Sequence, residues 1–218
     1  MTVDALSAPT LRIGEQFEDA LQQRAAVTFG MWVFIASEVM FFGALFFGYA
    51  IARIHAPDAF AAASRHTNIV IGTANTAVLL TSSFFVALAV RSIAAGAGRR
   101  TTWLLVVTAG LGLVFTALKL TEYAIDFREH LVPLVNFAFD PQYLPGALVF
   151  YGLYFVTTGL HLVHLTVGIV LVLVLAVQVR HANPNALRDR VEVAGLYWHF
   201  VDIVWIFLYP CLYLISRA

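Results

Sequence analysis

Five stretches of this chain are long and apolar enough to cross a lipid bilayer. A transmembrane helix needs about 20 mainly apolar residues. The stretches that reach this length cover approximately residues 28–52, 69–90, 102–123, 146–179 and 194–215. They are continuous rather than alternating, which argues against the short strands of a β-barrel. Hydrophobic residues make up 61% of the chain and charged residues 12%, about half the charged share of a soluble protein. We therefore predict an all-α integral membrane protein, a bundle of five transmembrane helices.

The arginines predict how this bundle is oriented. Cytoplasmic loops of membrane proteins carry an excess of Lys and Arg. Eight arginines lie on the side of the N-terminal tail, and four lie on the opposite side. The first group is Arg12, Arg24, Arg91, Arg99, Arg100, Arg180, Arg188 and Arg190, and the second is Arg53, Arg65, Arg128 and Arg217. We predict a cytoplasmic N-terminal tail, residues 1–27, and one five-helix domain, residues 28–218, whose C-terminus is outside.

Short polar links are expected between the spans. The first link begins at residues 56–58, and the other three cover residues 94–100, 126–145 and 181–190. Most of them contain Pro, Gly or Asn, which interrupt helices. The glycines of the first span, Gly30, Gly43 and Gly48, are expected to permit close helix approach. Pro210, inside the fifth span, is expected to kink the last helix.

Glu38 is the most unusual residue of the first span. It lies ten residues into an apolar run, which places it ~15 Å deep at ~1.5 Å per residue. An acidic side chain at the bilayer centre costs roughly 2.5–3.5 kcal/mol on translocon scales, so such residues usually face protein, water or a partner. Removal from water favours the neutral form of a carboxyl group. The sequence therefore offers two interpretations: a carboxyl with a proton- or lipid-linked role, or one hydrogen-bonded between helices.

The remaining intramembrane polar residues predict a packing network. Several of them lie three apart on a helix, as Lys119 and Glu122 do, and can meet on one face. The set is Asn75, Lys119, Glu122, His161, His164, His199 and Asp202. Pairs such as His199–Glu122 or His161–Asp202 would satisfy both members, and the sequence does not choose between them. Lys119 can also extend toward the interface.

Catalytic chemistry within the chain is not indicated. A single cysteine, Cys211, excludes a cysteine-built metal cluster. Three histidines could in principle ligate haem or copper, but opposed or additional ligands are not evident, so we predict structural histidines and no metal site. The balanced charge gives no basic field for nucleic acid. A stand-alone proton-coupled transporter remains an alternative, although an inverted repeat is not evident.

Each span also carries a short motif. In chain order these are Ser37-Glu38-Val39-Met40-Phe41-Phe42, Asn75-Thr76, Glu122-Tyr123, Thr158-Gly159-Leu160-His161 followed by His164, and Trp198-His199-Phe200-Val201-Asp202. In this order they resemble motifs of subunit III of the haem–copper oxidases, over residues 28 to the C-terminus. The chain looks like the shorter, five-span bacterial form of that family.

The resemblance implies a non-catalytic subunit of a respiratory terminal oxidase of the cytochrome c oxidase type, in the bacterial plasma membrane. It implies that this chain binds no haem or copper, and that it packs against catalytic subunit I, which holds them, and other oxidase subunits. It further implies support of proton uptake, protection of the catalytic subunit during turnover, and bound phospholipid. Glu38 falls on the family's buried glutamate, and the histidines and Asp202 fall on helix-packing and lipid-adjacent positions.

Two details of this interpretation stay open. The segments 118–123 and 207–214 look similar to a branch that accompanies nitric oxide reductases, whereas Phe200-Val201 follows the oxidase signature, which we favour. This chain does not distinguish cytochrome c from quinol as the electron donor. Arg53, Arg91 and Arg180 lie at span ends and are candidates for lipid headgroup contacts.

Overall fold

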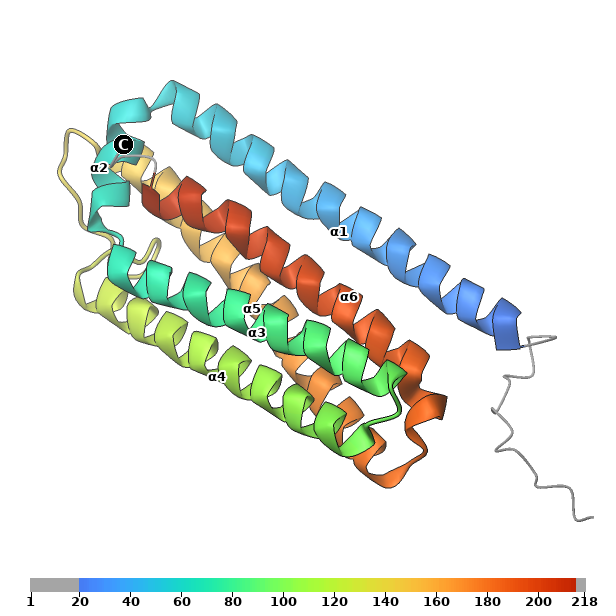
Figure 1. The fold of residues 1–218 in the computed structure, drawn as a ribbon. Helices are drawn as coiled ribbons and strands as arrows, with labels where there is room; N and C mark the ends of the chain where they lie inside the picture. The colour runs from blue at the N-terminus through green and yellow to red at the C-terminus, as the bar shows by residue number, and fades with distance from the viewer. Residues whose placement is uncertain (1–19, 215–218) are drawn as a thin grey trace, which may run out of the picture.

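The structure, a computed structural model, describes residues 20–214, and all regular structure among them is helical (Figure 1). Five helices are long and apolar enough to cross a membrane, as predicted. The elements are α1 (Ala20–His55), α2 (Pro57–His66), α3 (Ile69–Ala94), α4 (Gly98–Arg128), α5 (Leu144–His181), α6 (Pro184–Tyr209) and the π-helix η1 (Pro210–Leu214). The shortest of the five, at 26 residues, would span ~39 Å at ~1.5 Å per residue, more than the hydrocarbon core requires.

The helix ends correct two of the predicted links. Residues 57–66, expected to be part of a link, form the short helix α2, which begins with Pro57 in its first turn. The segment around Asn183 and Pro184 starts α6 instead of extending a link. Its Asn183 side chain accepts a hydrogen bond from the backbone N–H of Asn185, and proline is favoured in the first helical turn because its missing N–H is not needed there.

The helices also extend beyond the predicted spans. A hydropathy window detects only the apolar middle of a helix, whereas polar first and last turns continue it into the interface. Residues 20–27, assigned to the tail, are therefore the first turns of α1. The rest of the predicted tail, including Arg12, and Arg217 near the C-terminus lie outside the described residues.

Four helices form the packed core, and α1 lies beside it. Helices α3 and α5 each contact both α4 and α6, which closes a four-helix ring, while α1 packs along α5 and α6 (Figure 1). Among residues 21–55 only Phe42 and Tyr49 are buried. Most of the surface of α1 is therefore open to lipid or to another protein.

Close helix contacts occur at glycines other than those expected. A side-chain carbon built at Gly30, Gly43 or Gly48 would meet nothing within 4 Å, so the prediction for these positions is wrong. At Gly112 of α4 such a carbon would lie 2.9 Å from Ile169 and 3.0 Å from Trp198. The sequence does not distinguish these cases, because it does not show which face of a helix points toward a neighbour.

Proline 210 changes the helix type at the end of α6. The α-helix ends at Tyr209 and the chain continues as one π-helical turn, η1. Proline has no N–H to donate to the preceding turn, which accounts for the change in hydrogen-bond register. As a result Leu212 and Tyr213 point into the bundle and are buried.

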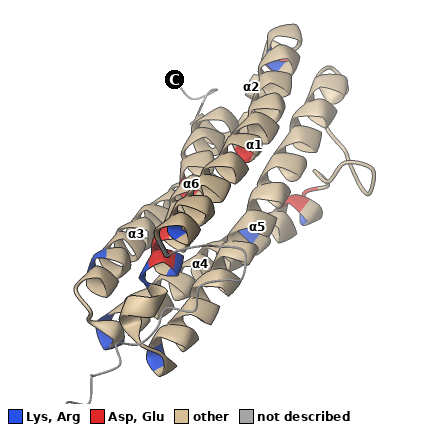
Figure 2. Ribbon diagram, turned by 90° about the vertical axis from the view of Figure 1, so that its right-hand side faces the viewer, with Lys and Arg blue, Asp and Glu red and all other residues tan. Residues whose placement is uncertain are grey.

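Arginines gather at one end of the bundle (Figure 2). At this end of the bundle α1, α4 and α6 begin and α3 and α5 finish. It carries Arg24, Arg91, Arg99, Arg100, Arg180, Arg188 and Arg190. Arg53, Arg65 and Arg128 lie toward the opposite end. This is the asymmetry that the sequence indicated. The orientation of the chain in a membrane stays a prediction.

Candidate functional site

Glu38 contacts a histidine of a different helix. Its Oε2 lies 3.1 Å from Nε2 of His164, which joins α1 to α5. Both side chains are partly exposed, at 19% for Glu38 and 17% for His164. The pair therefore lies at the margin of the bundle, with access to whatever covers the contact between α1 and α5.

The hydrogen bonds of His164 determine how many protons this pair holds. Nδ1 of His164 lies 2.9 Å from the backbone oxygen of Leu160. Because a carbonyl oxygen can only accept, Nδ1 must donate, and in a neutral imidazole Nε2 then carries no hydrogen. A hydrogen bond between Nε2 and Glu38 thus requires one further proton, on the imidazole or on the carboxyl group. The pair can hold one shared, exchangeable proton.

Neighbouring groups orient the histidine. The hydroxyl of Tyr197, from α6, donates to the backbone oxygen of His164 over 2.9 Å. Phe42 of α1 packs its ring edge-to-face against the imidazole, with centroids 5.4 Å apart. Three helices therefore define the position of the imidazole. The sequence analysis singled out both Glu38 and His164 but did not pair them.

A second cluster surrounds Lys119. Its Nζ donates to Glu122 Oε2 over 2.9 Å, to the hydroxyl of Tyr154 over 2.9 Å and to the hydroxyl of Tyr213 over 2.8 Å. The pair that the spacing of Lys119 and Glu122 predicted is present. The alternative of Lys119 reaching toward the interface is wrong, because its side chain is 0% exposed.

Three residues that the sequence analysis missed complete this cluster. Tyr213 of η1 donates to Glu122, and Tyr154 of α5 donates to Oδ2 of Asp126 over 3.1 Å. Asp126 was assigned to a link but lies in the last turns of α4 and is buried. The spacing 119, 122 and 126 places all three charged residues on one helix face, and this signal could have identified Asp126.

Contacts between α3 and α6 use hydroxyl groups of α3. Ser83 lies 2.7 Å from Nδ1 of His199, and Ser82 accepts from the indole N–H of Trp198 over 3.1 Å. Thr76 accepts from the indole N–H of Trp205 over 3.0 Å. Small polar residues are well suited to such helix contacts in membranes.

The other predicted members of the network are buried in the core. Asn75, His161 and Asp202 are at most 3% exposed, and their side-chain polar atoms lack a hydrogen-bond partner among residues 20–214. His161 packs between the rings of Phe115 and Trp205. Neither suggested pairing, His199–Glu122 or His161–Asp202, is formed, because each histidine lies against a different neighbour.

The three histidines that were considered as metal ligands contact different neighbours. Within the part of the chain that the structure describes, groups of three or more His, Cys, Asp or Glu placed to hold a metal ion are not found. His161, His164 and His199 occupy the three different surroundings given above.

Three cavities are lined by residues that the sequence analysis considered for lipid contact. An apolar groove of about 480 Å³ runs between α1 and α6, and Trp32, Phe42, His199 and Phe207 are among its lining residues. A cavity of about 460 Å³ near the end of α1 is lined by Arg53 together with Tyr49 and Cys211. Arg91 is exposed in the last turn of α3, and Arg180 lines a third cavity at the same end of the bundle.

Comparison with known proteins gives a consistent result over nearly the whole chain. Residues 15–217 match the family described as cytochrome c oxidase subunit III. Cytochrome c oxidase subunit 3 of Heterololigo bleekeri is 33% identical over 193 residues, which cover 84% of this chain and 68% of that relative. The protein of that name from Latimeria chalumnae is 30% identical, covering 91% and 73%. The one from Thermostichus vulcanus is 30% identical, covering 86% and 87%.

Proposed function

We propose a function for this chain from the premise that it belongs to the cytochrome c oxidase subunit III family. It is a multi-pass membrane subunit of a terminal oxidase and associates with other oxidase subunits. Within that complex we assign it a non-catalytic role in the bacterial plasma membrane. It packs against catalytic subunit I, which carries the haem and copper, supports proton uptake and stabilises that subunit during turnover.

The observation that carries the proton-linked role is the contact between Glu38 and His164. The geometry allows the pair to share one proton, and its partial exposure would let that proton exchange with groups outside the chain. Glutamate and histidine are groups whose protonation their surroundings readily change. A pair of this kind at the edge of the bundle is suited to holding a proton near a partner subunit.

The groove between α1 and α6 supports the proposed binding of phospholipid. Its lining is almost entirely apolar, as an acyl chain requires, and it includes Trp32 and Val39 of α1, which are both more than half exposed. Arg53, Arg91 and Arg180 are positioned at helix ends, where they can reach headgroups. Lipid held there would fill the space beside α1 and support its packing.

Replacing Glu38 by Gln in the intact oxidase tests the proton-linked role. Gln keeps the size of the side chain but cannot ionise, so it neither takes up nor releases a proton. We expect normal assembly and haem content, slower proton uptake, and a several-fold loss in the number of turnovers completed before inactivation. Oxygen consumption followed to exhaustion, together with stopped-flow measurement of proton uptake, checks this.

Glu129→Gln is the matched control, because Glu129 is an exposed carboxylate at the end of α4. It should behave as the unmodified complex does. Wild-type proton uptake and sustained turnover in a fully assembled Glu38→Gln complex would refute the role assigned to Glu38.

The assignment to an oxidase is tested by purifying the tagged chain in mild detergent. We expect a many-span haem–copper subunit to accompany it, identified by mass spectrometry and by a reduced-minus-oxidised haem spectrum. Oxygen consumption by this complex supports the oxidase, whereas consumption of nitric oxide alone would transfer the chain to a reductase. A folded, colourless chain that purifies alone would contradict both.

A further inference from the structure

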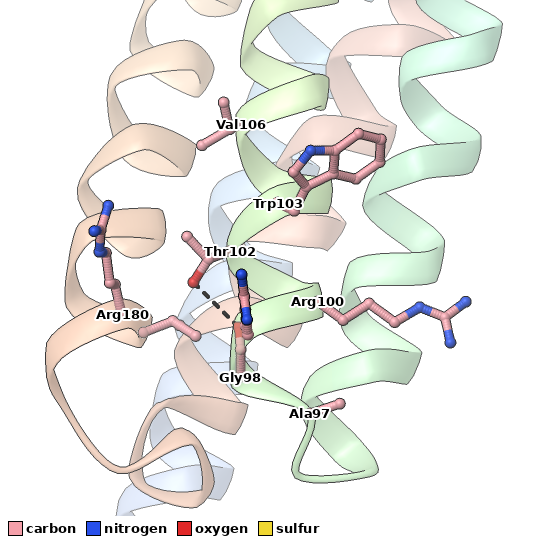
Figure 3. Close-up of a pocket in the computed structure, with 9 residues that line it drawn as sticks. Ala97, Gly98, Arg100, Thr102, Trp103, Val106 and Arg180 are labelled. Carbon is pink, nitrogen blue, oxygen red and sulfur yellow. Dashed lines mark hydrogen bonds between the residues drawn. The ribbon is translucent and has the colours of Figure 1, made fainter.

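A large pocket lies between the first turns of α4 and the last turn of α5. Its volume is about 1210 Å³, and it opens at the end of the bundle where the arginines gather. Figure 3 shows Arg180 on α5, whereas the Arg100 side chain extends from α4 on the side away from Arg180; Trp103 and Val106 lie farther along α4. The pocket is distinct from the groove between α1 and α6 and from the Glu38–His164 pair.

The pocket carries positive charge without a compensating acid. Arg99, Arg100 and Arg180 all line it, and its lining contains neither Asp nor Glu. Within residues 20–214 none of the three forms an ion pair. By contrast Arg24 and Arg188, at the same end of the bundle, both bind Glu192, over 2.9 and 2.8 Å. Unpaired arginines around one cavity favour an anionic ligand that the chain itself does not supply.

The start of α4 adds to the positive electrostatic potential of the pocket. The helix begins at Gly98 without a side-chain cap on its first turn. Its positive dipole end therefore lies at the same end of the bundle as the arginines. This contribution reinforces the charge of the side chains.

Along α4 the lining of the pocket changes from charged to aromatic to apolar, which matches the order of headgroup, glycerol region and acyl chain in a phospholipid. Arg99 and Arg100 lie at the helix start, Trp103 follows about one turn later and Val106 about two turns later. Trp103 is 62% exposed and Val106 is 49% exposed. Tryptophan is enriched at the boundary between headgroups and hydrocarbon. A soluble anion would use the arginines but would leave the apolar part of the pocket uncovered.

We propose that this pocket binds an anionic glycerophospholipid. Its phosphate lies near Arg99 and Arg180, and Arg100 adds positive charge from the other side of α4. Its glycerol region lies against Trp103, and an acyl chain extends over Val106. A zwitterionic lipid fits less well, because its ammonium group would face three cations and no carboxylate. The inference deepens the lipid role proposed above and rests on it, and it adds Arg99 and Arg100 to the candidate Arg180.

The test uses the purified complex after delipidation and reconstitution into phosphatidylcholine vesicles that contain a minor fraction of phosphatidylglycerol. Retained lipid is then counted by mass spectrometry. We expect phosphatidylglycerol to be enriched over phosphatidylcholine in the unmodified complex. In the variant Arg99→Gln/Arg100→Gln/Arg180→Gln this enrichment should fall about tenfold, because charge-assisted hydrogen bonds to the phosphate are lost.

The matched control removes three arginines from the same end of the bundle. Arg24→Gln/Arg188→Gln/Arg190→Gln loses equal charge, but these residues do not line the pocket, so its enrichment should be unchanged. An equal fall in both variants would overturn the site, as would no enrichment in the unmodified complex. Displacement of the lipid by soluble glycerol phosphate at similar concentration would overturn the assignment to a lipid.

The haem content of each preparation separates this inference from the proposed function. A complex that keeps its haem subunit but does not enrich phosphatidylglycerol contradicts the lipid site alone. A chain that purifies without a haem subunit contradicts the oxidase assignment, whatever lipid it retains. If the triple variant does not assemble, Arg180→Gln should still reduce the enrichment, and a wild-type value there would overturn the site.

Discussion

At the scale of single residues, the cluster around Lys119 explains how a lysine can lie fully inside a membrane bundle. An ammonium group has three N–H donors, and Glu122, Tyr154 and Tyr213 accept one each. Its charge is further stabilised by the face of the Tyr154 ring, whose centroid is 4.3 Å from Nζ. The cluster joins α4, α5 and η1, so its main effect should be on the stability of the bundle.

Replacing Lys119 by Met should therefore destabilise the protein strongly. The substitution keeps a long side chain but leaves Glu122 and Asp126 buried without a cation, and breaking a buried pair in this way costs about 3–5 kcal/mol. Thermal unfolding of the complex in detergent measures the effect. The double variant Lys119→Met/Glu122→Gln removes one unpaired charge and should recover part of the loss. Equal stabilities of the single variant and the unmodified protein would contradict this account.

These residues also show how far sequence reasoning reaches at this scale. The pair Lys119–Glu122 followed from spacing on one helix, which needs no tertiary information. Tyr154 and Tyr213 come from elements that are distant along the chain, and their contacts depend on how helices rotate against each other. The contact of Glu38 with His164 escaped prediction for the same reason.

At the scale of helices, Gly112 marks a close approach of α4 to both α5 and α6. A methyl group there would lie 3.0 Å from the Trp198 ring, and the indole cannot move without disturbing its hydrogen bond to Ser82.

The apolar runs predicted that five helices exist, but not their ends or their faces. Capping by Asn183 and the π-turn after Pro210 are decided by local hydrogen bonds that hydropathy does not measure.

Gly112→Ala should destabilise the bundle, and Gly110→Ala provides a matched control on the same helix. Overpacking a closely packed position typically costs about 1–3 kcal/mol. A side-chain carbon at Gly110 meets nothing within 4 Å, and alanine there should be neutral or gain up to about 1 kcal/mol from helix propensity. Thermal unfolding of the two variants separates packing from propensity. A similar change in both would show that the contact with Trp198 adjusts freely.

At the scale of the whole molecule, the charge asymmetry and the proposed lipid site depend on the same orientation. The arginine-rich end holds the pocket between α4 and α5, and anionic lipids attract basic segments on the cytoplasmic leaflet. The sequence predicts a cytoplasmic N-terminus from arginine counts, and the fold brings those arginines to one end without defining the membrane side. Orientation is a property of insertion, so contacts within the bundle do not determine it.

Cysteine labelling of oriented vesicles tests the predicted orientation. Cys211 is first replaced by Ser, and a single cysteine is then placed at Ala95, after α3, or at Leu134, in the loop between α4 and α5. Both positions are exposed, Leu134 at 98%, and they lie at opposite ends of the bundle. We expect a membrane-impermeant maleimide to label Ala95→Cys in inside-out vesicles and Leu134→Cys in right-side-out vesicles, because the excess of arginines retains its end of the bundle in the cytoplasm. The cysteine-free protein gives the background. The reverse pattern would place the arginine-rich pocket in the outer leaflet and would show that residues outside the arginine pattern determine insertion.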